Sequence, residues 1–302
     1  MPAARCWQDR PRLRAFPQYA SLASDGRLPD PTGGRRGMGR ETMVTRNTAW
    51  PAGTPCWIDL SVADVPKAKA FYGGLFGWQI LEGPPEAGGY SICEIDGDPV
   101  AGIGPKMGPA ETPTFWMTYL ASEDADETAA KVEAAGGQLV MGPMDVMDVG
   151  RMFIAADPGG AIFGVWQARA HTGVRRANEP ASLVWSENMS RNYEGNRAFY
   201  AAVFGYSYGD IGADGMKYAT LDLDGRPVGG IGDIGDDRPE MPASWGTYFA
   251  VADTDAAVTR VTELGGSVVA PAWDSPYGRM AVVRDDQGAA FAVMSVSEEQ
   301  QG

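Results

Sequence analysis

The sequence predicts an α+β protein of two tandem domains, each a pair of βαβββ units that together form a concave mixed sheet. Two observations carry this prediction: the chain repeats itself at a spacing of 128 positions, and each copy divides into two similar halves. In every half a strand pattern precedes a helical pattern, and several short strand patterns follow. The repeat determines how the local patterns are grouped into domains.

The duplication is visible in residues of characteristic type. Trp57 is followed 128 positions later by Trp185, and Phe-Tyr and Phe-Gly dipeptides recur at the same spacing. A slip of one residue then aligns Trp116, Thr118 and Tyr119 with Trp245, Thr247 and Tyr248. A chain of 302 residues that is 44% hydrophobic has enough apolar material for two domain cores.

The first half of the first copy shows the local signals most clearly. Residues 56–61 alternate as a strand, and residues 65–76 carry a helical apolar pattern with Asp64 as the N-cap and Gly77 at the end. Strands are expected at 90–95 and 99–103, and the turn pair Asp96-Gly97 joins them as a hairpin.

The second half repeats this order and completes the domain. A strand is expected at 115–121, a helix over 124–135 before Gly136-Gly137, and strands near 138–141, 151–156 and 161–167. The domain boundaries that follow are 54–167 for the first domain, 168–181 for the linker and 182–297 for the second domain.

The N-terminal residues differ in composition from the rest. Residues 1–42 contain eight arginines, four acids, several prolines and no sustained apolar period, so the chain is expected to be disordered over 1–48. One interpretation is a basic arm or a targeting peptide. The favoured interpretation is a start assigned too far upstream, with Met43 as the true first residue.

Charge and cysteine content restrict the partners. A net charge of −14 argues against binding to nucleic acid or to an anionic membrane, which need a basic surface. No apolar run is long enough to span a membrane, so a cytoplasmic protein with a small-molecule partner is expected. The three cysteines are scattered, which indicates buried free thiols at Cys56 and Cys93.

Two motifs resemble a known superfamily. The helix that ends in Phe71-Tyr72 and Phe76-Gly77, followed later by the turn Asp157-Pro158-Gly159-Gly160, resembles the vicinal oxygen chelate superfamily of glyoxalases, bleomycin-resistance proteins and extradiol dioxygenases. The resemblance covers nearly everything after residue 53. In its two-domain form the chain resembles actinobacterial proteins called glyoxalase-like or hydroxylase.

The resemblance implies metal-ligand positions, and this sequence does not fill them with ligands. Metal-using members carry histidine and glutamate at three strand positions, which here correspond to Trp57, Met117 and Gly164. The second copy has Trp185, Gly246 and Ala292 there. No metal and no other cofactor are therefore expected.

The sequence also has glycine-rich stretches near residues 102–104 and 229–232. We attribute these glycines to strand ends where two backbones approach closely.

Strand alternation indicates which side chains line the concave faces. Trp57 and Asp59 share one face of their strand, as do Trp185 and Glu187, so each domain offers an indole and a carboxylate. Asp59 and Glu187 are the candidate acid–base groups. The candidate ligand-binding residues are Trp57, Tyr119, Arg151, Trp185, Tyr248 and Arg279.

Two alternatives remain open for these residues. An acid against an aromatic wall has a raised pKa that suits acid–base chemistry, but Asp59 and Glu187 could instead pair with Arg151 and Arg279 inside the fold. The single histidine, His171, lies in the linker, where a structural or solvent-facing role is favoured over a catalytic one.

Two classes of function follow. The first is a metal-independent protein that binds and sequesters a small aromatic or polyketide-like metabolite. The second is a metal-independent enzyme of secondary metabolism, hydroxylase-like or cyclase-like, of lyase or oxidoreductase type without the usual metal triad. Lactoylglutathione lyase or dioxygenase activity is implied only by the resemblance. The duplication favours a pseudo-symmetric monomer, with a homodimer as the alternative.

Overall fold

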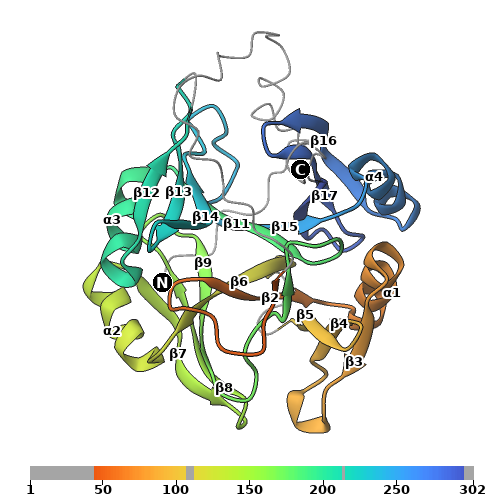
Figure 1. The fold of residues 1–302 in the computed structure, drawn as a ribbon, viewed down its shortest axis with the longest axis horizontal. Coiled ribbons are helices and arrows are strands. Elements are labelled where there is room, and N and C mark those ends of the chain that lie inside the picture. The colour runs from red at the N-terminus through yellow and green to blue at the C-terminus, as the bar shows by residue number, and fades with distance from the viewer. Residues whose placement is uncertain (1–43, 107–111, 213–214, 296–302) are drawn as a thin grey trace, which may run out of the picture.

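The computed structural model describes residues 44–106, 112–212 and 215–295. Two large mixed sheets, four α-helices and a short 3-10 helix (Pro85–Ala87) account for the regular structure of these residues, and each sequence copy forms one sheet (Figure 1). The predicted α+β class and the tandem organisation are confirmed.

The sheet of the first domain has the strand order β3-β4-β5-β2-β6-β9-β8-β7. Strand β2 pairs in parallel with β5 and antiparallel with β6, and the β2–β6 contact joins the two βαβββ units. The elements are β2 (Pro55–Val62), α1 (Val65–Phe76), β3 (Gln79–Glu82), β4 (Ser91–Ile95), β5 (Asp98–Pro105), β6 (Phe115–Ser122), α2 (Ala125–Ala134), β7 (Gln138–Val146), β8 (Gly150–Ala156) and β9 (Ile162–Ala168).

The local signals of the sequence act as expected. The Asp64 carboxylate accepts the Lys67 backbone N–H at the start of α1, and Gly77 ends the helix in the left-handed conformation at φ 72°. Asp96 and Gly97 both have positive φ, as the tight turn of a β-hairpin requires. Strand β3 was not predicted, because its four mostly exposed edge residues show no alternation.

The second domain repeats this arrangement with the order β12-β13-β14-β11-β15-β18-β17-β16. Its elements are β11 (Leu183–Met189), α3 (Tyr193–Phe204), β12 (Ser207–Asp210), β13 (Tyr218–Leu223), β14 (Arg226–Gly232), β15 (Ser244–Ala250), α4 (Thr254–Glu263), β16 (Ser267–Ser275), β17 (Gly278–Arg284) and β18 (Ala290–Ser295).

The expected disordered extension over 1–48 reaches too far along the chain. Strand β1 (Val44–Thr45) pairs antiparallel with β10 (Arg176–Ala177) of the linker, and the Arg46 guanidinium donates to the carbonyls of Thr48 and Ala49. These backbone and side-chain hydrogen bonds give residues 44–49 a defined place. The rest of the predicted extension, residues 1–43, lies outside the described residues.

The two sheets stack through their helix-bearing faces. Helix α1 lies beside α4 and helix α2 beside α3, one pair at each side of the interface, and between the pairs the central strands of the two sheets are in direct contact, β6 against β15 (Figure 1). One core cluster joins Phe71 and Tyr72 of α1 to Phe249 and Phe291 of the second domain. A second joins residues of α2 and β8 to Phe199 and Tyr200 of α3. Each core is therefore shared, and the concave faces point away from each other.

Reciprocal hydrogen bonds connect the domains inside these shared cores. The Tyr72 hydroxyl of α1 donates to Asp285 Oδ2 of the second domain at 3.0 Å. The Tyr200 hydroxyl of α3 donates to Asp157 Oδ2 of the first domain at 2.9 Å. Both carboxylates belong to the turns before the last strands, and both are almost fully buried. The Phe-Tyr dipeptide of the sequence therefore does more than fill the core.

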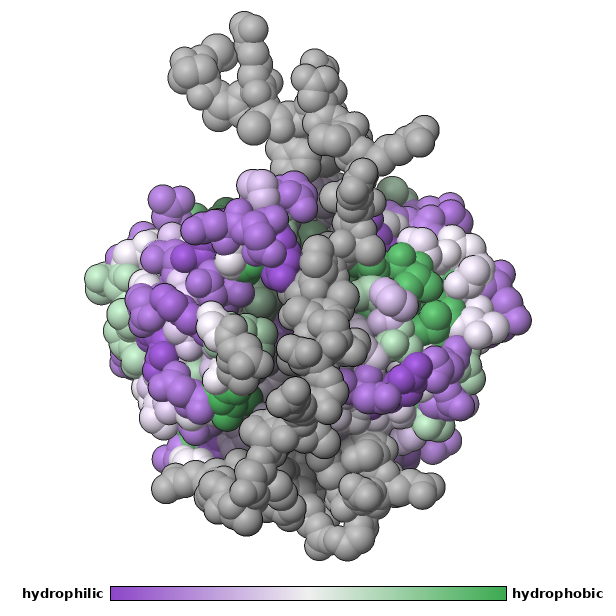
Figure 2. Space-filling view, turned by 90° about the horizontal axis from the view of Figure 1, so that it is seen from above, coloured by the Kyte–Doolittle hydropathy of each residue, from purple (hydrophilic) through white to green (hydrophobic). Residues whose placement is uncertain are grey.

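The outer surface is largely hydrophilic in the view of Figure 2, with apolar side chains in separate patches. Large exposed apolar residues are spread over several strands and loops: Leu81, Val140, Met144, Met147, Ile211, Met216 and Val268. Among the described residues, no helix combines the length and apolarity needed to cross a bilayer.

The reciprocal bonds give a prediction about stability. Tyr72→Phe leaves Asp285 Oδ2 without a side-chain donor, whereas after Tyr200→Phe the Asp157 Oδ2 still accepts from Asn188 and Asn196. We expect Tyr72→Phe to lower the free energy of unfolding by about 1–3 kcal/mol, because a buried carboxylate oxygen without a hydrogen-bond donor is destabilising. Tyr200→Phe should lower the free energy of unfolding by less. Urea denaturation of the two variants measures the difference, and an equal or larger loss for Tyr200→Phe would be inconsistent with this account.

Candidate functional site

The concave face of the first domain carries a hydrogen-bonded cluster of one tryptophan, two tyrosines and one carboxylate. Trp57 Nε1 donates to the Tyr90 hydroxyl at 2.9 Å, and that hydroxyl donates to Asp59 Oδ2 at 3.2 Å. The Tyr119 hydroxyl of β6 donates to the same oxygen at 3.0 Å. Three predicted site residues, Trp57, Asp59 and Tyr119, therefore meet in one place.

The second domain contains the same cluster. Trp185 Nε1 donates to the Tyr218 hydroxyl at 3.0 Å, which donates to Glu187 Oε2 at 2.8 Å. The Tyr248 hydroxyl donates to Glu187 Oε1 at 2.6 Å. The register explains the match, since Trp57 lies opposite Tyr119 and Trp185 lies opposite Tyr248 across the central strand pair.

The two clusters differ in exposure. In the first domain Trp57 is only 3% exposed, while Asp59 and Tyr90 are half-buried. In the second domain Glu187 is 6% exposed, while Trp185 and Tyr218 are half-buried. A ligand therefore reaches the carboxylate more easily in the first domain and the indole more easily in the second.

Tyr90 and Tyr218 were missed as site residues by the sequence analysis. They lie one position before β4 and at the start of β13, and their rings cross to the neighbouring strand. The signal that could have identified them is the repeat itself, because they are 128 positions apart.

Glycines on the neighbouring strand make room for these rings. A Cβ on Gly102 would lie 1.9 Å from the Tyr90 hydroxyl, and a Cβ on Gly230 would lie 2.0 Å from the Tyr218 hydroxyl. The expectation that these glycines permit close approach of backbones is wrong for both positions. They instead permit a tyrosine ring to lie flat on the sheet and reach the carboxylate.

Burial shifts the ionisation of both acids. Desolvation raises the pKa of Asp59 to about 6, although the hydroxyls of Tyr119 and Tyr90 lower it in part. Desolvation likewise raises the pKa of Glu187, against the opposing effect of its two tyrosine donors. Neither acid has an arginine or lysine partner among the described residues, so both are held by neutral hydroxyls.

Arg151 and Arg279 do not belong to these clusters. Arg151 binds Asp126 of α2 at 2.8 Å and Asp145 of β7 at 3.0 Å, and Arg279 binds Asp255 of α4 and Asp274 of β16 in the same way. Strand alternation places both arginines on the helix-bearing face, because Met152 and not Arg151 packs into the concave cluster. The alternative in which they pair with Asp59 and Glu187 is wrong.

His171 lies closer to the first site than its place in the linker suggests. Its ring contacts the edge of Trp57 at 4.3 Å between centroids and Trp166 at 5.5 Å. Burial lowers the pKa of His171 to about 4, and Nε2 is buried without a hydrogen-bond partner among the described residues. The histidine is therefore neutral and packed, which excludes the solvent-facing role.

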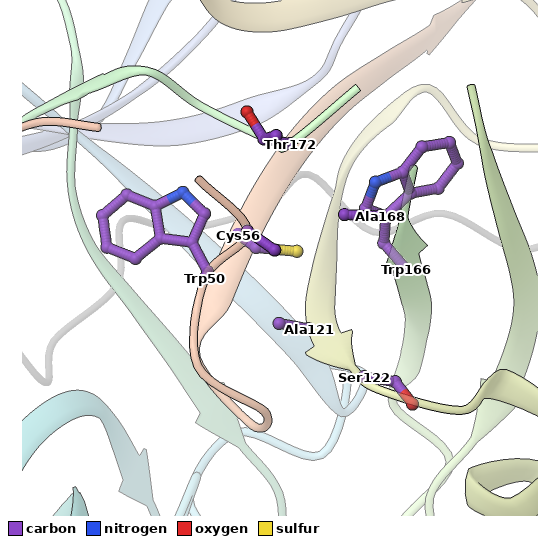
Figure 3. Close-up of a pocket in the computed structure, with 8 residues that line it drawn as sticks. Trp50, Cys56, Ala121, Ser122, Trp166, Ala168 and Thr172 are labelled. Carbon is purple, nitrogen blue, oxygen red and sulfur yellow. The ribbon is translucent and has the colours of Figure 1, made fainter. Parts of the chain in front are cut away.

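A small pocket beside the first cluster contains Cys56 (Figure 3). Figure 3 shows the thiol between the indoles of Trp50 and Trp166, with Ala121 and Thr172 nearby. Cys56 and Cys93 are both buried free thiols, as predicted, and burial raises the pKa of each well above the usual range. Burial outweighs the opposing charge of Lys69 at Cys93, so neither thiol is ionised as a reactive cysteine is.

The side chains on the concave faces do not fit a metal ion. The register places Trp57, Tyr119 and Gly164 in one row across the first sheet, and Trp185, Tyr248 and Ala292 across the second. Burial raises the pKa of Tyr119, whose hydroxyl is already bonded to Asp59, so it is a poor ligand. No group of three or more His, Cys, Asp or Glu that could hold a metal occurs within the described ranges.

The profile of the Glyoxalase/Bleomycin resistance protein/Dioxygenase superfamily matches residues 56–165 and 188–293. The chain is 38% identical over 263 residues to the putative glyoxylase CFP32 of Mycobacterium bovis. This alignment covers 85% of this chain and 100% of that protein. It is 37% identical over 265 residues to the anthracycline biosynthesis protein DnrV of Streptomyces peucetius, covering 83% and 96% of the two chains.

Solved structures of low identity share the fold. The Mn(II)-bound glyoxalase of Novosphingobium aromaticivorans has a TM-score of 0.58 at 16% identity, over 81% of this chain and 83% of that one. The dioxygenase LapB of Pseudomonas has a TM-score of 0.57 at 11% identity, over 81% and 93%. At these identities the likeness concerns the fold alone.

The glycine under Tyr90 gives a prediction about the site. We expect Gly102→Ala to lower the free energy of unfolding by about 1–3 kcal/mol, because the added methyl must displace the Tyr90 ring and overpack the face. Gly142→Ala on β7 is the matched control, since a Cβ there meets no atom within 4 Å. Chemical denaturation compares the two variants; equal stabilities would mean that the ring is not held where the hydrogen bonds place it.

Proposed function

Because the chain belongs to the Glyoxalase/Bleomycin resistance protein/Dioxygenase superfamily, we propose that it is a metal-independent member that binds a small aromatic or polyketide-like metabolite. The ligand lies on the concave faces, against the aromatic clusters around Asp59 and Glu187. Binding without chemical conversion is the simplest activity that this arrangement supports, since the tryptophan and tyrosine rings offer large apolar surface with polar edges.

The observation that carries this proposal is the recurrence of the Trp–Tyr–carboxylate–Tyr cluster at the centre of both sheets. Metal-using relatives gather their ligands on this face, and here indole and phenol rings take up that space. The resemblance to DnrV, an anthracycline biosynthesis protein, supports an aromatic polyketide as the ligand class.

A titration tests the proposal. We expect a tetracyclic aromatic polyketide to bind saturably, to quench tryptophan fluorescence and to be recovered unchanged, with the same affinity in the presence of a metal chelator. Trp185→Leu should weaken binding to the second domain by roughly two- to twelve-fold, as the loss of one aromatic contact of about 0.5–1.5 kcal/mol implies.

Arg151→Ala serves as the control for this titration, because Arg151 lies on the helix-bearing face and should not affect binding. Loss of binding on chelation, or a larger effect of Arg151→Ala than of Trp185→Leu, would argue against the proposal.

A second candidate function is a metal-independent enzyme in which Asp59 acts as a general base. The pKa of about 6 favours it, because such a carboxylate is ionised at neutral pH and still basic enough to remove a proton beside a carbonyl. Asp59 is the better candidate of the two acids because it is half-buried, whereas Glu187 is 6% exposed.

This candidate predicts a pH-dependent rate. We expect deuterium exchange at the carbon beside the carbonyl of an aromatic ketone to be fast above pH 6 and to fall as the pH drops through about 6, where Asp59 becomes protonated. Asp59→Asn should abolish the exchange and Glu187→Gln should leave it. If the protein binds the ketone tightly but exchange is no faster than the uncatalysed rate, the enzymatic function is contradicted and only the binding function remains.

A further inference from the structure

The hydrogen-bond inventory of the first cluster restricts the ligand that it can take. The cluster has three polar hydrogens, one each on the Trp57 indole, the Tyr90 hydroxyl and the Tyr119 hydroxyl. All three are used inside the cluster, the first by the Tyr90 oxygen and the other two by Asp59 Oδ2. What remains for a ligand is lone pairs on the two phenolic oxygens and on the carboxylate.

The carboxylate of the first domain keeps one oxygen for this purpose. Asp59 Oδ1 accepts no hydrogen bond from any described residue, and Asp59 is half-buried rather than enclosed. In the second domain both Glu187 oxygens accept a tyrosine hydroxyl, and the residue is 6% exposed. The two domains therefore share a cluster, but only the first offers an unused carboxylate oxygen.

The charges near Asp59 also favour a ligand that donates a hydrogen bond over one that carries a negative charge. Arg151, which could have neutralised Asp59, is held by Asp126 and Asp145 on the opposite face of the sheet. His171 beside Trp57 is neutral, because burial lowers its pKa to about 4. An anionic group placed against Asp59 would meet a like charge and no unused donor of the cluster, whereas a hydroxyl hydrogen would meet a charged acceptor, which makes a strong hydrogen bond.

We infer that the first domain selects aromatic ligands that carry a phenolic hydroxyl, bound as a hydrogen-bond donor to Asp59 Oδ1, and rejects those that carry a carboxylate. This inference rests on the proposed function and narrows its ligand class. It also separates the two domains, because the second can bind aromatic surface through Trp185 without selecting for a donor.

A series of three matched bicyclic aromatics tests the inference on the full chain by isothermal titration calorimetry near neutral pH. Naphthol, methoxynaphthalene and naphthoate, substituted at the same ring carbon, differ in offering a donor, an acceptor only, or a negative charge. We expect naphthol to bind at least roughly ten-fold more tightly than methoxynaphthalene and naphthoate to bind most weakly, as a charge-assisted hydrogen bond requires.

Two isosteric variants locate the selectivity. Asp59→Asn removes the charge and adds an amide donor, so the preference for naphthol over methoxynaphthalene should fall to about two-fold or less and naphthoate should gain affinity. Asp126→Asn is the matched control and should keep the wild-type order, because Asp126 pairs with Arg151 on the helix-bearing face. Glu187→Gln tests whether the second domain contributes to the selectivity. The wild-type series needs no variant, so it remains decisive even where Asp59→Asn does not fold.

The outcomes separate this inference from the proposed function. Equal affinity for naphthol and methoxynaphthalene, with the tetracyclic polyketide still bound, would overturn the donor rule alone. Loss of selectivity in Glu187→Gln instead of Asp59→Asn would overturn the assignment to the first domain. Failure of the wild-type protein to bind any of these aromatics, the tetracyclic one included, would overturn both.

Discussion

The hydrogen bond between Tyr72 and Asp285 and its counterpart between Tyr200 and Asp157 join the two domains at buried positions, inside the apolar cores that the domains share. Each bond ties a helix of one domain to the turn before the last strand of the other domain. Because the two helix-bearing faces are held together, the aromatic residues beside them complete two cores that both domains share. The concave faces are directed outward as a consequence.

The same requirement, that buried polar groups form hydrogen bonds, explains the side chains on the concave faces. A carboxylate without a cationic partner is expensive to bury, and here two tyrosine hydroxyls satisfy it in each domain. The indole N–H then bonds to one of those hydroxyls, so every polar hydrogen of the cluster is used and only acceptor lone pairs remain, including those of Asp59 Oδ1 in the first domain. Such a face presents aromatic surface and acceptor oxygens in the place where metal-using relatives gather ligands, and its chemistry differs accordingly.

Most of the fold could be predicted from the sequence, because local signals and the repeat agree. The Asp64 cap, the Gly77 helix end and the Asp96-Gly97 turn each fix a boundary within one or two residues. The site could be predicted only where strand alternation was enough, as for Trp57 and Asp59. Alternation fixes a face only once one residue of a strand has been placed, and Arg151 was placed on the wrong face.

The remaining features depend on contacts between segments far apart in the chain. Tyr90 reaches Asp59 because Gly102 on another strand leaves space, and His171 reaches Trp57 because the linker folds back over the first domain. The bond from Tyr72 to Asp285 joins residues more than two hundred positions apart. No periodicity or turn signal within one segment reports such contacts.

Native mass spectrometry of the full chain, purified from its own cells, distinguishes a metal-free binding protein from a metalloprotein, because one spectrum reports bound metal and bound organic mass together. We predict a protein without metal that carries a discrete adduct, with the mass of a hydroxylated aromatic metabolite. A stoichiometric divalent metal retained by the folded protein would contradict it, since the clusters around Asp59 and Glu187 leave no set of ligands to hold one.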